Sequence, residues 1–569
     1  MTLRDLFRNS LLTIRNLLRS LRRKGLDYVV LNLRGAYPER TPRQDPLPFP
    51  LNLLPLLPSE ASLEKMKVVL ERLGDDRRVR GVIVRFDALQ AGPSALYSLR
   101  RMLLELRAKG KHVIAWAPSP DTWEYYLASA CDEIILPPSG RLSALGLRSE
   151  ALFLKETLAL AGVEADLEAI AEYKVSPDTF RRSAMTEPHR EMLDAILDGY
   201  FDEILSAVAE GRGLDQNRIR ELIDTMPLTP GEAVEAGLVD AVLYEDELAA
   251  HLSGASSEED EITLLTWQEA ARWLRRPARW TTRQRIGVVS LEGMIVPGHS
   301  RRVPSPLPLP LPFEAQAGSK TITRALRRAE ADEHIAAVIF HVETPGGSAL
   351  ASDLICREVR RLRKRKPVVV LMGGQAASGG YYVSALADRI VARPTTLTGS
   401  IGVWGGKFVL ADLYDRLGVG RKVMQRGAMA DLHSEMTSFS EEERALIRRD
   451  MGENYARFKA HVAEGREMSE EQVEEIARGR VWTGVQALDV GLVDTLGDFE
   501  TALAAAKELA ALEPERDYTV VQITSPRQAL LPRPFPAAES AWATIPDALQ
   551  NLARERVWAL APWLVRVQG

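Results

Sequence analysis

Gly81-Val-Ile-Val-Arg-Phe86 and Ala337-Val-Ile-Phe-His-Val342 open two stretches of this chain that repeat one another. The stretches cover residues 81–146 and 337–402, and they align without a gap at a constant offset of 256 residues. Matched pairs occur along the whole length, including Val82 with Val338, Arg101 with Arg357, Val113 with Val369, Asp132 with Asp388 and Pro138 with Pro394. A register of this length indicates two copies of one architecture.

Short apolar strands alternate with helical stretches in both copies. We predict strands at 28–35, 82–86, 113–117 and 134–136 in the first copy, and at 287–293, 338–342, 368–371 and 390–392 in the second. This alternation predicts parallel βαβ units, so the fold class is α/β with two tandem units. Long helical stretches follow at 187–210 and 441–464, and a similar cassette closes each copy at 231–240 and 482–494.

The repeat also predicts a domain organisation. We expect an amphipathic helix at 1–25, an N-terminal copy at 26–265, a linker at 266–283, a C-terminal copy at 284–512 and a tail at 513–569. The tail contains Trp558, Trp563 and Leu564 and could contact a membrane or a second subunit. Proline-rich stretches at 46–58 and 304–312 are expected to be long surface loops, because proline removes backbone donors.

Composition narrows the function classes. The 569 residues are 46% hydrophobic and 27% charged, which is typical of globular proteins with several domains. A net charge of −5 gives no electrostatic footprint for nucleic acid. The two cysteines, Cys131 and Cys356, do not correspond under the repeat and are expected to be buried free thiols. The scattered histidines give no metal-binding pattern.

The N-terminus is predicted to form a cationic amphipathic helix. Its apolar stripe consists of Leu3, Phe7, Leu11, Ile14, Leu18 and Leu21, and seven basic residues lie between Arg4 and Lys24. Arginines interrupt every apolar run, so the segment is a poor secretory signal. Its apolar runs are also too short to span a bilayer. Such a helix can lie flat on anionic lipid, or it can dock on its own protein or on a partner.

Polar residues with catalytic potential are concentrated in the second copy. Ser378 stands in Ala376-Ala-Ser-Gly-Gly380 between a predicted strand and a helix, where the first copy has Thr122. A serine on such a turn is either a nucleophile or a helix cap. The same copy has Gly346 and Gly347 after the preceding strand, where backbone N–H groups can be directed at an oxyanion.

A nucleophilic serine needs a base. Neither His341 nor His433 is well placed in the sequence, whereas a lysine can serve if burial lowers its pKa. The first copy has Lys174 in a segment whose counterpart at 426–430 contains no lysine. Serine in one copy and lysine in the other favour a site shared by both copies.

These motifs resemble the long, two-copy form of the bacterial signal peptide peptidase A family over most of residues 27–513. The resemblance is carried by Pro345-Gly-Gly-Ser348, Ala377-Ser-Gly-Gly-Tyr-Tyr382, Leu397-Thr-Gly-Ser-Ile-Gly-Val403, Tyr173-Lys174 and Val481-Trp-Thr-Gly484. It implies a fold related to the Clp protease and crotonase folds and a homotetramer. It also implies a Ser/Lys dyad: Ser378 as nucleophile, Lys174 as base, Ser400 as the residue that orients the base, and Gly347 and Gly379, with Gly346 beside them, at the oxyanion.

The chain departs from the family pattern at three places: the charged N-terminal helix, the long proline-rich loops, and Glu343-Thr344 before Pro-Gly-Gly. We therefore predict a membrane-associated serine endopeptidase that degrades cleaved signal peptides and other unfolded hydrophobic peptides. It would need no cofactor and would associate peripherally through the N-terminal helix, with the cytoplasmic face favoured. The alternatives are an acyl-CoA enzyme of crotonase-like fold and a non-catalytic membrane scaffold.

Overall fold

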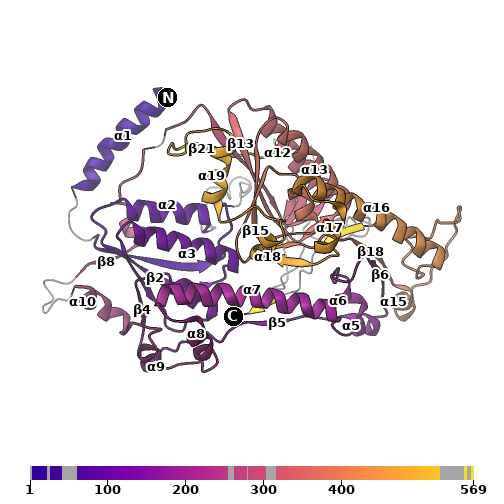
Figure 1. Cartoon of the computed structure of the whole chain (residues 1–569), viewed down its shortest axis with the longest axis horizontal. Coiled ribbons are helices and arrows are strands. Elements are labelled where there is room, and N and C mark those ends of the chain that lie inside the picture. Colours follow the sequence, from indigo (N-terminus) through magenta and orange to yellow (C-terminus); the bar gives the residue numbers. More distant parts are fainter. Residues whose placement is uncertain are drawn as a thin grey trace. The chain divides into compact units, whose positions relative to one another are not determined.

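The computed structural model describes residues 3–21, 26–41, 61–253, 262–278, 280–302, 315–525, 557–560 and 566–568 (Figure 1). The two proline-rich stretches and the acidic run at 258–261 lie outside these residues. The chain forms two compact units. The first comprises Met1–Arg148, Tyr200–Thr281 and Gln568–Gly569, and the second comprises Ser149–Gly199 and Thr282–Val567.

Among its described residues, the first unit contains one six-stranded sheet, all of whose strand pairs are parallel. In spatial order the strands are β7 (Ala241–Val242), β4 (Glu133–Leu136), β3 (His112–Trp116), β2 (Gly81–Leu89), β1 (Tyr28–Gly35) and β8 (Leu264–Thr266). The segment expected to be a linker thus begins within edge strand β8. Valine and isoleucine fill the central strands, as expected for a parallel sheet buried on both faces.

Helices of the first unit accompany this sheet, and most of them lie between its strands in the sequence. They are α1 (Leu3–Ser20), α2 (Leu63–Gly74), α3 (Pro93–Ala108), α4 (Thr122–Ala128), α8 (Gln216–Ile223), α9 (Pro230–Glu235), α10 (Leu248–Ser253) and α11 (Trp267–Ala270), with a 3₁₀ turn at Glu245–Glu247. α2 and α3 lie side by side (Figure 1). The boundary between the units falls inside the long helix α7 (Glu187–Arg212), and β5 (Arg148–Glu150) and β23 (Arg566–Gln568) also cross it in sequence.

The second unit contains a larger, mainly parallel sheet. Its strands in order are β19 (Val481–Thr483), β17 (Leu397–Gly399), β15 (Val368–Ala377), β13 (Ile335–Thr344), β9 (Arg285–Glu292) and β21 (Thr519–Gln522), and β16 (Arg389–Ala392) with β20 (Thr495–Leu496) extends from β15. Only β19 runs antiparallel to its neighbour.

A second sheet of this unit has seven strands in the part of the chain that the structure describes. They are β11 (Arg301–Arg302), β12 (Ala315–Gly318), β10 (Met294–Val296), β14 (Gly346–Ser348), β22 (Val557–Leu560), β18 (Trp404–Val409) and β6 (Glu164–Ala169). β6 comes from the segment 149–199 and pairs antiparallel with β18. The sequence repeat assigns this segment to the N-terminal copy, but the pairing places it in the same compact unit as the C-terminal copy.

Ten helices among the described residues of the second unit surround these sheets. They are α5 (Lys155–Leu160), α6 (Asp178–Arg181), α12 (Ser319–Ala331), α13 (Ala349–Arg363), α14 (Gly379–Ser384), α15 (Ala411–Arg416), α16 (Glu441–Arg466), α17 (Glu470–Ile476), α18 (Gly484–Asp489) and α19 (Phe499–Leu509). α12 and α13 pack together (Figure 1). The core between the helices and the sheet includes Phe340, Val370, Tyr381 and Phe458.

The repeat is visible in the contacts as well as in the sequence. In the first unit, Arg107 Nε donates to Asp132 Oδ1 at 2.7 Å. In the second unit, Arg363 Nε donates to Asp388 Oδ1 at 2.7 Å. The aligned aspartates therefore have the same structural role, and the predicted α/β fold with an internal duplication is confirmed. Cys131 and Cys356 are both buried and free.

Candidate active site

Ser378 occupies a strained turn between β15 and α14. Its φ is 56° and its ψ is −111°, a conformation that a residue other than glycine rarely adopts. The Ser378 N–H donates to Gly399 O at 2.7 Å, and the residue is completely buried. Its side chain makes no capping hydrogen bond to α14, although it stands at the N-cap position. The geometry therefore does not support the helix-cap interpretation.

Ser400 stands next to Ser378 because two parallel strands end together. β15 and β17 pair in a register that puts Ala377 opposite Gly399, so the residues that follow lie at the same edge of the sheet. Ser400 also has a positive φ, of 49°, and its N–H donates to Arg480 O at 2.6 Å. A parallel register thus brings two buried hydroxyl groups from separate segments together.

Lys174 comes from the segment that follows β6. Two backbone hydrogen bonds place this segment: Ile170 N–H donates to Val403 O at 3.0 Å, and Tyr173 N–H donates to Arg478 O at 3.1 Å. The Lys174 side chain is only 1% exposed. Its Nζ lies 2.6 Å from Ser378 Oγ, 3.0 Å from Ser400 Oγ and 3.1 Å from Ser400 O.

These partners of Lys174 are all neutral groups. Burial without a compensating carboxylate disfavours the charged amine, so the pKa of Lys174 lies well below that of an ordinary lysine. The neutral amine has a lone pair that can accept the proton of Ser378. The structure thus brings together Ser378, Lys174 and Ser400, the three hydroxyl and amine residues singled out by the sequence.

Gly479 is a neighbour of Lys174 that the sequence analysis missed. It has a φ of +85°, and a Cβ added to it would lie 2.4 Å from Lys174 N. Its own N–H donates to Ile401 O at 2.9 Å. Gly479 therefore packs directly between the lysine segment and the residue that follows Ser400. One sequence without an alignment gives no signal that this glycine differs from any other turn glycine.

Arg480 is a second neighbour that the sequence analysis missed. Its guanidinium lies 4.5 Å from the ring centroid of Trp482 and 5.2 Å from that of Tyr173, and its Nη1 donates to Glu191 Oε1 at 2.7 Å. Tyr173 Oη donates to Glu191 Oε2 at 2.8 Å. Glu191 and Arg480 thus hold Tyr173, the residue before Lys174, through a hydrogen bond and a cation–π contact.

The three glycines expected at the oxyanion differ in their surroundings. Gly347 lies in β14, and a Cβ there would stand 2.0 Å from Ile295 O, so only glycine fits. Gly379 is the first residue of α14, directly after Ser378. The Gly346 N–H already donates to Thr344 Oγ1 at 3.0 Å. Gly347 and Gly379 are consequently better candidates for oxyanion donors than Gly346.

Glu343, one of the residues that depart from the family pattern, braces β15. Its carboxylate accepts hydrogen bonds from Gly374 N–H at 2.7 Å and Gln375 N–H at 3.1 Å. Burial raises the pKa of this carboxyl group, whereas nearby His341 and the two N–H donors lower it. Glu343 thus holds the strand that leads into Ser378, whereas the hydrogen-bond partners described for the Lys174 amine are Ser378 and Ser400.

The aligned position in the first unit has an ordinary structural role. Thr122 begins α4, and its hydroxyl donates to Gly146 O at 2.9 Å. Asp121 caps that helix, because its side chain accepts a hydrogen bond from Glu124 N–H.

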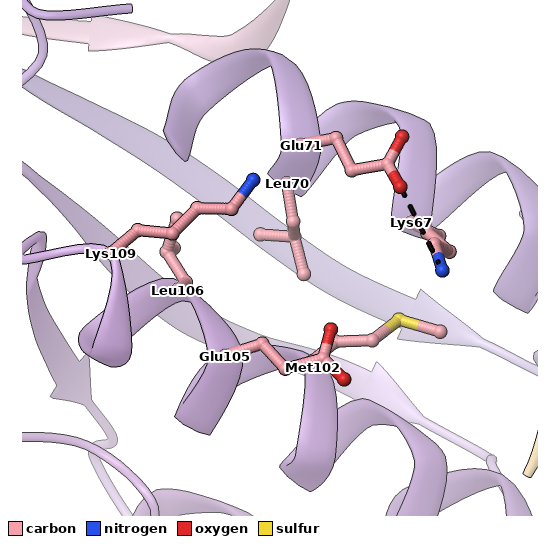
Figure 2. Close-up of a pocket in the computed structure, with 7 residues that line it drawn as sticks. All are labelled: Lys67, Leu70, Glu71, Met102, Glu105, Leu106 and Lys109. Atoms are coloured by element: carbon pink, nitrogen blue, oxygen red, sulfur yellow. Dashed lines mark ion pairs between the residues drawn. The ribbon is translucent and has the colours of Figure 1, made fainter. Parts of the chain in front are cut away.

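A pocket of the first unit lies between α2 and α3, where Lys67 Nζ stands 3.7 Å from Glu71 Oε1 (Figure 2). The seven residues that line it include no hydroxyl, thiol or imidazole group, so we assign it no chemistry.

The two histidines considered as bases lie elsewhere. His341 is buried in β13, with its Nδ1 3.9 Å from Glu292 Oε1. His433 is exposed in a turn between α15 and α16. The residues that follow Ser400 on the way into β18 are Ile401, Gly402, Val403 and Trp404.

Comparisons with known proteins place the chain in a family. The sequence model of Peptidase family S49 matches it twice, at residues 105–257 and 360–513. Serine protease SPPA, chloroplastic, of Arabidopsis thaliana is 32% identical over 83% of this chain and 69% of the relative. Protease 4 of Haemophilus influenzae is 28% identical over 88% and 83%, and Protease 4 of Salmonella typhi is 31% identical over 80% and 73%.

Among solved structures, a ClpP1 mutant from Listeria monocytogenes overlaps 38% of this chain and 94% of its own, with 14% identity and a TM-score of 0.24. The assignment rests on the sequence matches and not on this overlap. The protein is a serine peptidase built on a duplicated α/β fold, and its substrates are peptides. The chain belongs to Peptidase family S49.

Proposed function

We propose that this peptidase is an endopeptidase that works through a Ser378/Lys174 dyad. The observation that carries the proposal is the distance of 2.6 Å between Lys174 Nζ and Ser378 Oγ in a fully buried site. A lysine whose pKa is lowered by burial can act as a general base near neutral pH. Ser400 would orient the amine through its hydroxyl and its carbonyl group.

The proposed reaction proceeds through an acyl-enzyme. The neutral amine of Lys174 takes the proton of Ser378, and Oγ attacks the scissile carbonyl carbon. The N–H groups of Gly347 and Gly379 stabilise the negative oxygen of the tetrahedral intermediate. Lys174 then gives its proton to the leaving amine. In the second half of the reaction the neutral amine takes a proton from water, and the hydroxide attacks the ester carbonyl carbon. The bond to Ser378 Oγ then breaks, and Lys174 returns the proton to Oγ, which regenerates the serine hydroxyl and the neutral amine.

The two alternatives from the sequence have less support. An acyl-CoA enzyme would use the glycine N–H groups but would not need a buried lysine beside a strained serine. A non-catalytic scaffold would not need to keep the destabilising combination of positive φ at Ser378 and Ser400 and a desolvated amine at Lys174. Strain and burial of this kind concentrate at functional sites.

We further propose that the substrates are unfolded hydrophobic peptides, among them cleaved signal peptides, and that the enzyme is a homotetramer. Both proposals come from the family resemblance. A peptide has to be extended for its carbonyl group to reach a serine at the end of a buried strand. Unfolded segments meet that requirement, whereas folded proteins do not.

We also propose that α1 attaches the protein peripherally to an anionic membrane. The helix turns its polar side to the first unit: Asn16 Nδ2 donates to Arg276 O at 2.9 Å, and Thr281 Oγ1 donates to Asp5 Oδ1 at 3.1 Å. The opposite side is apolar and exposed, with Phe7 at 75%, Leu18 at 59% and Leu21 at 71%. Among the described residues, none of the helices is long and apolar enough to cross a bilayer.

The decisive experiment for the dyad compares two substitutions at equivalent positions of the repeat. Ser378→Ala should abolish hydrolysis of an unstructured peptide, because it removes the nucleophile. Thr122→Ala in the first unit should retain the rate of the unmodified protein. Thermal unfolding of both variants checks that the fold persists. Substantial turnover by a folded Ser378→Ala protein would refute the assignment. A fluorophosphonate should label the unmodified protein and the Thr122→Ala variant at Ser378, and it should not label the Ser378→Ala variant.

A further inference from the structure

A pocket of the first unit lies between α1, α2 and the residues that follow α11. Its volume is about 400 Å³, which is in the range of small-molecule sites. The residues that α1 contributes include two arginines and two leucines, Arg8, Leu11, Leu12 and Arg15. Each leucine is three or four positions from each arginine, so the four side chains lie on one face of the helix.

Hydrogen bonds hold the walls of this pocket together. Arg276 N–H donates to Asn16 Oδ1 of α1 at 3.1 Å, and Asn16 Nδ2 donates back to Arg276 O at 2.9 Å. Arg72 of α2 donates through Nη2 to Ala271 O at 2.9 Å and through Nε to Arg275 O at 3.2 Å. The segment 271–276 is thus tied to both helices, and the pocket is a preformed feature of the unit.

The pocket carries an excess of positive charge. Four of its nine lining residues are arginines and none is acidic; the arginines are Arg8, Arg15, Arg72 and Arg276. Asp5 pairs with Arg8, with Oδ1 3.0 Å from Nη2. Among the residues that the structure describes, neither Arg15 nor Arg276 has an ion-pair partner. Burial and the nearby charge of Arg276 lower the pKa of Arg72, and Asp76 opposes this shift. An anion in the pocket would relieve the crowding of like charges.

The pocket borders the apolar stripe of α1. Leu11 lines the pocket and also belongs to the stripe, and it is 41% exposed. When an amphipathic helix lies in a membrane surface, its apolar side is buried at the boundary between headgroups and acyl chains. The neighbouring pocket would then open at the level of the lipid phosphates. Guanidinium groups bind phosphate through pairs of charge-assisted hydrogen bonds.

We propose that this pocket binds the phosphate group of one anionic glycerophospholipid. Arg15 and Arg276 bind the phosphate, and the apolar side chains of Leu12 and Val68 lie beside the glycerol and the first methylene groups. The inference rests on the peripheral attachment of α1 proposed above and names the ligand of that attachment. Non-specific attraction to a membrane depends on how many basic residues are near its surface, whereas a pocket depends on which ones are present.

Equilibrium dialysis of the full-length protein with dihexanoyl phosphatidylglycerol, kept below its micelle concentration, tests the pocket. We expect saturable binding of one lipid per chain. Arg276→Gln should raise the Kd about tenfold or more, because charge-assisted hydrogen bonds to the phosphate are lost. Arg275→Gln is the matched control: it removes the same charge from the neighbouring exposed residue, which does not line the pocket, and should leave the Kd unchanged. Thermal unfolding checks that both variants are folded. Equal Kd values for the two variants, or no saturable binding by the unmodified protein, would overturn the inference.

Inorganic phosphate distinguishes a lipid from a free phosphate ion as the ligand. In the same dialysis it should displace the lipid only at concentrations about tenfold or more above the Kd of the lipid, because it lacks the apolar contacts with Leu12 and Val68. Displacement at concentrations equal to that Kd would overturn the assignment to a lipid.

Leu18→Glu separates this inference from the attachment on which it rests. Leu18 belongs to the exposed apolar stripe and does not line the pocket. The variant should lose binding to vesicles of phosphatidylcholine and phosphatidylglycerol, and it should bind the soluble lipid with a Kd within about twofold of the original. Undiminished vesicle binding refutes attachment through the stripe. Loss of vesicle binding, combined with equal Kd values for Arg276→Gln, Arg275→Gln and the unmodified protein, refutes the pocket alone.

Discussion

At the scale of single residues, the buried amine of Lys174 determines the pH range in which the proposed site can work. Desolvation lowers the pKa of this amine well below that of an ordinary lysine, and its partners Ser378 and Ser400 contribute no negative charge. In the proposed mechanism, the neutral form of the amine is the base. Activity should therefore rise with pH through the lowered pKa and reach a plateau above it.

Two substitutions of Lys174 test this account. Lys174→Arg should be inactive at every pH, because a guanidinium does not release its proton in the accessible range. Lys174→Met should be inactive as well, but it removes the ionisable group and keeps the volume. Both variants are measured as kcat/KM against pH on an unstructured peptide. An active arginine variant would show that another group is the base.

Lys174→Met also predicts a pH-dependent stability difference. Folding lowers the pKa of Lys174, so the unfolded state binds more protons between the lowered pKa and the ordinary lysine value. In that window the free energy of unfolding of the unmodified protein should rise with pH, relative to the methionine variant, by up to about 1.4 kcal/mol per pH unit. Urea unfolding at several pH values measures it. A pH-independent difference would contradict a lowered pKa.

At the scale of elements, the turn after α17 packs against both the lysine segment and the strand end that carries Ser400. Gly479 has its backbone against Lys174 N and donates to Ile401 O. The neighbouring Arg480 accepts from Ser400 N–H through its carbonyl oxygen. One turn therefore contacts both the segment of the proposed base and the strand end that carries Ser400, and we expect it to position them.

Gly479→Ala tests whether this turn positions Lys174, because a positioning role predicts a loss of kcat beyond the loss of stability that strain alone would cause. The added Cβ would lie 2.4 Å from Lys174 N, and the backbone of the lysine segment would have to shift. We expect kcat to fall by about a hundredfold, because misplacement of a catalytic group by about 1 Å has an effect of that size.

Gly427→Ala is the matched control for Gly479→Ala. Gly427 also has a positive φ, of +99°, but nothing lies within 4 Å of the position where its Cβ would be. Alanine there should cost about 1–2 kcal/mol of strain and leave kcat unchanged. If both variants lose the same stability and the same activity, Gly479 has no special role in positioning Lys174.

At the scale of the whole molecule, α1 provides the proposed attachment to a membrane. Leu18→Glu should weaken co-sedimentation with vesicles that contain an anionic lipid by about tenfold or more, because burial of a leucine contributes about 1.5–3 kcal/mol. Activity on soluble peptides should persist, since α1 belongs to the first compact unit and the dyad to the second. High salt should also release the unmodified protein, because the basic residues of α1 act through screened electrostatic attraction.

Thr13→Glu is the control for Leu18→Glu. It adds the same charge to α1 at an exposed polar position. It should reduce vesicle binding less than Leu18→Glu does. Equal losses would mean that the charge alone matters and that the apolar stripe does not enter the bilayer. Binding that resists salt and yields only to detergent would indicate a stronger anchor than an in-plane helix.

Local patterns in the sequence determined much of this protein. The gapless repeat, the alternation of apolar strands with helices and the glycine-rich turns are properties of short stretches, and they predicted the duplicated α/β fold that the structure and the family match confirm. Strands β1 and β13 and helices α7 and α16 lie at or within two or three residues of their predicted bounds. The same patterns singled out Ser378 and Lys174, and the family resemblance added Ser400.

Only the tertiary structure decided which residues meet. The segment 149–199 follows the N-terminal copy in sequence, but β6 pairs with β18, so Lys174 belongs to the same compact unit as Ser378. Gly479 and the backbone of β22 are near the site for the same reason: they pack or pair with segments distant in sequence. Periodicity and spacing report on neighbours along the chain, whereas strand pairing between distant segments depends on the complete set of competing contacts, which no local pattern records.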